Sequence, residues 1–140
     1  MENEERPDEE NCIQQRFVID VADAEGLRRS AALMILNRMS YVSQQIFDEP
    51  TPSPDKTKQY INRIVEYDSQ QSDYLLPDTP LKEAAFRVLL ASGNKPMSAE
   101  EISEVLSEKW SMTAYPRDVS PRVIQRLLEH SDPYCIVKTS

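Results

Sequence analysis

Basic side chains near the C-terminal end of the chain could contact nucleic acid. Arg122 and Arg126 lie four residues apart, so on a helix they share one exposed face. Arg117 precedes that helix, and Lys138 lies close to the C-terminus. Such cations bind phosphate oxygens, and a glutamine such as Gln125 can read the edge of a base. Together these residues predict a nucleic-acid-binding surface.

Acidic residues lie among these cations and leave a second interpretation open. Asp118, Glu129 and Asp132 flank the arginines and weaken the positive potential around them. The same surface is therefore predicted to bind either DNA or a protein partner. A DNA surface with four phosphate contacts would show a salt slope of about −3.6, at about −0.9 per contact.

The sequence lacks the patterns of catalytic and metal-binding sites. Its single histidine is His130, and Cys12 and Cys135 are far apart with no CxxC pair, so we expect no zinc site. There is no glycine-rich phosphate loop and no supported nucleophile–base arrangement. We therefore expect a protein that is not an enzyme and that needs no metal, cofactor or small-molecule substrate.

The net charge of −8 is unevenly distributed. Residues 1–80 contain 8 Lys+Arg and 16 Asp+Glu, whereas residues 81–140 contain 8 of each sign. All of the excess acid therefore lies in the first part of the chain, where it could attract a basic partner. No apolar run approaches the roughly 20 residues that span a bilayer. We expect no membrane contact and a cytoplasmic location, associated with the nucleoid or nucleus if the protein binds DNA.

The first 78 residues are predicted to form an acidic tail and a helical unit. Residues 1–11 are too acidic and too poor in apolar residues to pack, so we expect a disordered tail. Within the unit at 12–78, residues 12–22 alternate as in a short strand, although a helical turn is also compatible. A polyproline-like connector at 49–54 and a helix to about Ser69 follow.

The longest predicted helix spans residues 24–47. Its apolar residues recur at three- and four-residue spacing, which gives one continuous face. That face either belongs to the core or forms a homodimer or partner interface. It consists of Ala32, Ile35, Met39, Val42 and Ile46.

Three further helices are predicted in the unit at 79–140, and each begins with a clear signal. Pro80 suits the first position of one helix, and Gly93 suits the left-handed position just after its end. Ser98 and Glu101 form a capping box at the start of the second helix. Ser120, followed by proline, can cap the third.

A terminal strand completes this unit. Residues 134–138 are rich in aromatic and β-branched types, which favours a strand. Because a strand needs a partner for its backbone, we predict that it pairs with residues 111–115 in a two-stranded wing. Three helices followed by such a strand are the order of a winged helix. The predicted fold class is therefore mainly α, with a helical N-terminal unit and a small winged-helix-type domain.

Residues 80–110 also resemble the opening of a HARE-type helix-turn-helix domain. The first helix of that family is matched by Leu81, Ala84, Ala85, Val88 and Leu89, its turn by Lys95, Pro96 and Met97, and its second helix by Glu101 and Ile102. The resemblance covers about 60 of the 140 residues. It implies a winged helix of the kind found in chromatin-associated factors, nucleases and the delta subunit of bacterial RNA polymerase.

The sequence thus predicts a DNA-binding winged-helix protein with a regulatory or accessory role in transcription or genome maintenance. The alternative is a non-catalytic interaction subunit of a larger complex. In that alternative, the winged helix and the acidic first part of the chain would bind protein partners.

Overall fold

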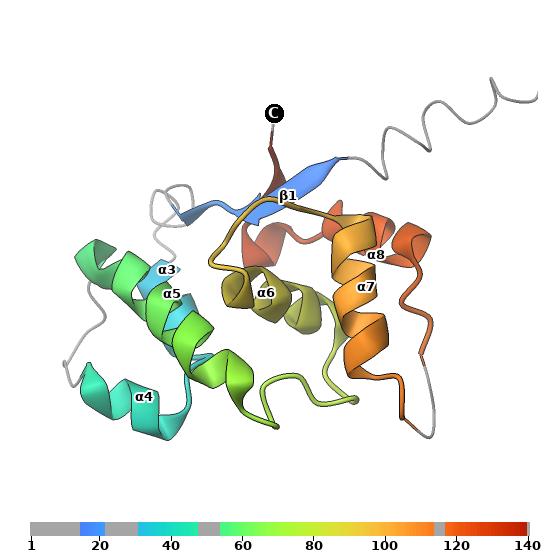
Figure 1. Ribbon diagram of the computed structural model, residues 1–140. Helices are drawn as coiled ribbons and strands as arrows, with labels where there is room; N and C mark the ends of the chain where they lie inside the picture. The colour runs from blue at the N-terminus through green and yellow to red at the C-terminus, as the bar shows by residue number, and fades with distance from the viewer. Residues whose placement is uncertain (1–14, 22–30, 48–53, 114–116, 140) are drawn as a thin grey trace, which may run out of the picture.

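A computed structural model describes residues 15–21, 31–47, 54–113 and 117–139. These residues are mainly helical, which confirms the fold class predicted from the sequence, and they include one small antiparallel sheet (Figure 1). The predicted acidic tail at 1–11 and the connector residues 49–53 lie outside the described residues. The elements are β1 (Arg16–Ile19), α3 (Ala31–Leu36), α4 (Tyr41–Ile46), η2 (Pro54–Lys56), α5 (Thr57–Glu66), η3 (Asp68–Gln70), α6 (Leu81–Ala91), β2 (Met97–Ser98), α7 (Ala99–Lys109), α8 (Pro121–Leu128), η4 (Asp132–Tyr134) and β3 (Ile136–Lys138).

The sheet has three strands in the order β2-β1-β3, and both pairings are antiparallel. Phe17 is opposite Met97 on one side and Lys138 on the other. The predicted pairing of the terminal strand with residues 111–115 is therefore wrong. Residues 111–113 are not in a strand, and residues 114 and 115 lie outside the described residues. The partner is instead β1, which comes from the other end of the chain.

One large hydrophobic core joins the first and last parts of the chain. Phe17 and Ile19 of β1 point into it because side chains of a strand alternate between its two faces. The same core contains Ile64 of α5, Leu89 of α6 and many other buried residues. It also includes Ile35, Phe86, Ile102, Leu106, Ile124 and Leu128. The units predicted at 12–78 and 79–140 thus share one sheet and one core.

The helix predicted at 24–47 is not continuous. Residues 24–30 lie outside the described residues, and the rest forms α3 and α4 with a break at residues 37–40. Ser40 has extended backbone angles, and its side chain accepts a hydrogen bond from the Ser43 amide at 3.2 Å. It is therefore the N-cap of a new helix. The apolar periodicity continues through the break, so the pattern alone did not show it.

A Schellman motif ends α6, and Gly93 takes the predicted left-handed conformation with φ +82°. The Asn94 amide donates to the Leu89 carbonyl at 2.8 Å, and the Gly93 amide donates to the Leu90 carbonyl at 2.9 Å. The Asn94 side chain then bonds both the amide and the carbonyl of Ile19, each at 2.9 Å. The end of α6 is thereby attached to β1.

The predicted capping box begins α7. The Ser98 hydroxyl accepts from the Glu101 amide at 3.2 Å, and the Glu101 carboxylate accepts from the Ser98 amide at 2.9 Å. Glu101 also forms an ion pair with Arg16 of β1 at 2.8 Å, although both side chains are about half exposed. The box thus stabilises the point at which α7 meets the sheet.

We expect Ser98→Ala to lower the free energy of unfolding by about 1 kcal/mol, because it removes the cap of α7. Ser107→Ala is the matched control, since Ser107 is exposed in the last turn of the same helix, away from the cap. The control should be neutral or slightly stabilising because alanine has the higher helix propensity. Urea denaturation measures both variants. Equal changes in the two would argue against a stabilising role for the cap.

Candidate functional site

Helix α8 carries the predicted basic surface. Pro121 occupies its first turn as expected, although the Ser120 side chain forms no capping hydrogen bond to the helix. Ile124 and Leu128 are buried in the core. Arg122 and Arg126 lie on the exposed side, one turn apart. The structure therefore brings these two arginines together on one outward face.

Gln125 does not face solvent, contrary to the prediction. Its side chain is 6% exposed, and its amide nitrogen donates to Glu129 at 2.9 Å and to Gln15 at 3.0 Å. The amide oxygen is buried without a hydrogen-bond partner. Gln15 directly precedes β1, so the residue that leads into the sheet lies against this side of α8. Gln125 is therefore not available to read a base edge in this structure.

The other two predicted contacts lie on other elements. The Arg117 guanidinium lies 4.5 Å from the centre of the Trp110 ring, so a cation–π contact holds it at the end of α7. Lys138 is exposed at the end of β3, an outer strand of the sheet. Only Arg122 and Arg126, of the four cations, are thus shown to share one face.

Acidic groups close to α8 are partly engaged in local bonds. The Asp118 carboxylate accepts from the Ser120 amide at 3.0 Å, and the backbone and side-chain hydrogen bonds from Ser120 lower the pKa of Asp118. Glu129 accepts from Gln125. Because both acids stay near the arginines, they reduce the positive potential of this surface.

The predicted dimer or partner face is divided by the break before α4. Ala32, Ile35 and Met39 are 0%, 0% and 5% exposed, so they belong to the core and cannot contact a partner. Val42 and Ile46 are 53% and 57% exposed. Only these last two remain available at the surface. Tyr41 is 76% exposed beside them, but the sequence pattern did not predict it at this surface, because it does not fit the stripe of one continuous helix.

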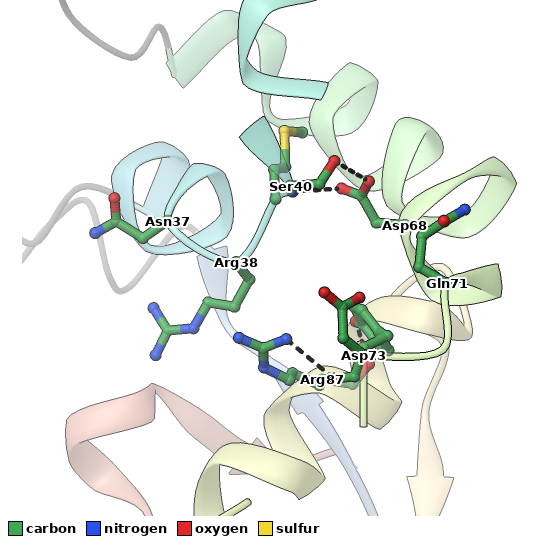
Figure 2. Close-up of a pocket in the computed structure, with 9 residues that line it drawn as sticks. Asn37, Arg38, Ser40, Asp68, Gln71, Asp73 and Arg87 are labelled. Atoms are coloured by element: carbon green, nitrogen blue, oxygen red, sulfur yellow. Dashed lines mark hydrogen bonds between the residues drawn. The ribbon is translucent and has the colours of Figure 1, made fainter. Parts of the chain in front are cut away.

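A polar pocket of about 210 Å³ lies where the α3–α4 break meets η3 and α6 (Figure 2). Figure 2 shows Ser40 and Asp68 on one side of it and Asp73 and Arg87 on the other. The remaining lining residues are Asn37, Arg38, Met39, Gln71 and Tyr74. No sequence pattern indicated this pocket, because its walls come from segments far apart in the chain.

An ion-pair cluster borders the pocket. Glu83 accepts two hydrogen bonds from Arg38, at 2.9 and 3.0 Å, and one from Arg87 at 2.9 Å. Burial alone would raise the pKa of Glu83, but the bonds from both arginines outweigh it and hold the pKa below its usual value. Arg87 also donates to the Tyr74 carbonyl at 3.0 Å, and the Tyr74 hydroxyl donates to the Arg87 carbonyl at 2.7 Å. Burial, the largest cause, raises the pKa of this hydroxyl.

The pocket has the chemistry of a structural polar network. Asp68 accepts a hydrogen bond from the Ser40 hydroxyl, and Arg87 donates to the Tyr74 carbonyl. The pocket is also smaller than the roughly 300–1,000 Å³ of typical ligand sites, which are more apolar. Within the described residues, no three His, Cys, Asp or Glu side chains are grouped to hold a metal ion. We therefore assign no ligand to this pocket.

Comparison of the chain with protein-family models, with curated proteins and with solved structures finds no match in any of the three. In the described part of the chain, no helix has the length and apolar character needed to cross a membrane.

Proposed function

We propose that this chain is a non-catalytic DNA-binding protein of the winged-helix type, with α8 as the helix that contacts DNA. The observation that carries the proposal is the position of Arg122 and Arg126. Both side chains are exposed on one face of α8, while the opposite face is buried through Ile124 and Leu128. This arrangement leaves two guanidinium groups one turn apart where a duplex can approach.

The order of the elements supports the same proposal. Helices α6, α7 and α8 are followed by the terminal strand β3, and a short strand, β2, lies between the first two helices. In helix-turn-helix proteins the recognition helix enters the major groove, and α8 takes that place in the order. Two features differ from the common pattern. The connection between α7 and α8 is longer than a three- to four-residue turn, and β1 supplies the central strand.

The burial of Gln125 favours contact with phosphates over reading of bases. Hydrogen bonds to phosphate oxygens position a protein but carry no sequence information, whereas contacts to base edges specify a site. With Gln125 covered by Gln15, the exposed groups on α8 that suit DNA are arginines. We therefore propose binding that depends on salt and discriminates weakly between sequences.

We expect Arg126→Ala to weaken binding to a random-sequence duplex and to reduce the salt slope by about 0.9. The double variant Arg122→Ala/Arg126→Ala should reduce the slope by about 1.8. Fluorescence anisotropy at about 50 and 200 mM salt measures both affinities. Lys58→Ala is the matched control, because it removes one exposed cation from α5 and so changes the net charge by the same amount.

No binding by the unmodified chain at about 50 mM salt would exclude the DNA proposal. An equal loss in Arg126→Ala and Lys58→Ala would mean that net charge, and not the α8 face, governs binding. Either result would favour the alternative of a protein-interaction subunit. In that case, the same two arginines would be tested against acidic protein partners.

A further inference from the structure

The start of β1 is attached to α8 beside the two exposed arginines. The Gln15 side chain accepts a hydrogen bond from the buried Gln125 amide at 3.0 Å. Arg126 follows Gln125 directly in the chain, and Arg122 lies three residues before it, about one turn along the helix. The part of the chain that precedes Gln15 is therefore held close to both arginines.

A third exposed cation lies near the same point. Lys138 is the strand partner of Phe17, which is two residues after Gln15. The Thr139 amide also donates to the Arg16 carbonyl at 2.8 Å, so β3 runs alongside the first residues of β1. Three of the cations that were predicted to bind nucleic acid thus lie close to the start of β1.

The segment that precedes Gln15 carries the opposite charge. Residues 2–10, which we call the acidic segment, contain six acidic residues and one arginine, which gives a net charge of −5. The whole chain has a net charge of −8, so most of its excess negative charge lies in this segment. Opposite charges that are held close together attract each other. The acidic residues are Glu2, Glu4, Glu5, Asp8, Glu9 and Glu10.

The connection to Gln15 is long enough for this contact. Glu10 is five residues before Gln15, and an extended chain spans at most about 3.6 Å per residue, so Glu10 can reach about 18 Å from it. Helix α8 has eight residues and is only about 12 Å long. A short link of this kind gives an effective concentration on the order of millimolar. The acidic segment therefore meets α8 more often than a separate, dilute partner would.

We propose that the acidic segment binds Arg122 and Arg126 of its own chain and competes there with DNA. A guanidinium group donates to carboxylate and to phosphate oxygens in the same way, so the two anions exclude each other at one arginine. Exposed ion pairs are weak and are screened by salt, so the contact is reversible. The competition rests on the proposed function, whereas the contact between the segment and α8 does not.

Paramagnetic broadening in the full chain tests the contact. A nitroxide is attached through Asn3→Cys in a Cys12→Ser background, which keeps all six acids, and Cys135 stays unlabelled because it is 3% exposed. At about 50 mM salt, the amide signals of residues 122–126 should broaden more than those of residues 58–62 on α5. The broadening should decrease at about 500 mM salt, because salt screens exposed charges.

Neutralising the acidic segment separates attraction from simple proximity. Asp8→Asn/Glu9→Gln/Glu10→Gln keeps the same link to Gln15 but removes three charges, so it should reduce the broadening on α8. Broadening that changes neither with salt nor with these substitutions would overturn the proposal. Broadening of an isotopically labelled chain by the nitroxide of a second chain in a mixture would also overturn it, because the segment would then bind another copy.

DNA binding tests the competition. If about half to nine-tenths of the molecules have α8 covered, the neutralised variant should bind a random-sequence duplex about two- to tenfold more tightly at about 50 mM salt. Asp55→Asn/Glu66→Gln/Asp78→Asn is the matched control, because it removes three exposed charges that lie before α5, at its end and before α6. Figure 1 shows α5 and α8 on opposite sides of the molecule. The control should therefore change the affinity much less.

The two measurements separate this proposal from the proposed function. Equal tightening of DNA binding by the two triple variants would show that net charge governs the affinity, and it would overturn the competition. If no variant binds DNA at about 50 mM salt, the proposed function fails. Broadening on α8 that depends on salt and on the three acids would still support the contact in that case.

Discussion

Phe17→Ala is expected to lower the free energy of unfolding of the whole chain by about 3–5 kcal/mol. Phe17 is 1% exposed and lies on the central strand of the sheet, between β2 and β3. Its ring is part of the core that also contains residues of α6, α7 and α8. Removal of the ring leaves a cavity in this shared core. We therefore expect the loss to affect the C-terminal helices as much as β1.

Urea denaturation followed by two probes measures this effect. Far-UV circular dichroism reports all helices, and fluorescence reports Trp110, which is 7% exposed at the end of α7. Both transitions should shift together to lower urea concentration. Val18→Ala is the matched control, because Val18 is on the opposite face of the same strand and only half-buried, and it should cost much less. An unchanged Trp110 transition in Phe17→Ala would show that the C-terminal helices are stable without β1.

Glu83→Gln is expected to lower the free energy of unfolding by about 2–3 kcal/mol at neutral pH. Breaking a fully buried ion pair costs about 3–5 kcal/mol, and this cluster is partly exposed, with side-chain exposures of 18% for Arg38, 18% for Glu83 and 24% for Arg87. The variant leaves two guanidinium groups near each other without their shared carboxylate. It also weakens the link between the α3–α4 break, which contains Arg38, and α6.

The pH dependence of this loss follows from the lowered pKa of Glu83. A carboxyl whose pKa is lower in the folded than in the unfolded state contributes stability above the unfolded pKa, which is about 4.3. That contribution is lost as the pH falls through the folded pKa. The unmodified chain should therefore be more stable than Glu83→Gln at pH 7, and the difference should shrink below about pH 4.

Urea midpoints from pH 7 to pH 3 measure this convergence. Glu104→Gln is the matched control, because Glu104 is exposed on α7, and it should change the midpoint little at any pH. A difference between the unmodified chain and Glu83→Gln that stays constant down to pH 3 would contradict the ion-pair explanation.

The sequence by itself determined the features that depend on neighbouring residues. The capping box at Ser98, the left-handed Gly93 and the proline in the first turn of α8 were predicted, and the structure confirms each of them. The alternation that predicted a strand within residues 12–22 corresponds to β1. Hydrogen bonds, dihedral preferences and side-chain periodicity among a few neighbouring residues determine such features. They can therefore be predicted from the sequence before the fold is known.

Only the tertiary structure decided which of these elements meet. The terminal strand pairs with β1 instead of with residues 111–115, and Gln125 is covered by Gln15 from the start of that strand. The α3–α4 break and the orientation of α4 depend on Asp68, which bonds Ser40 and Ser43. These outcomes depend on contacts between residues 25 to 123 positions apart, for which local periodicity carries no information. The α8 arginines were therefore visible in the sequence, whereas the burial of Gln125 and the separation of the exposed Val42 and Ile46 from the rest of their predicted face were decided by the fold.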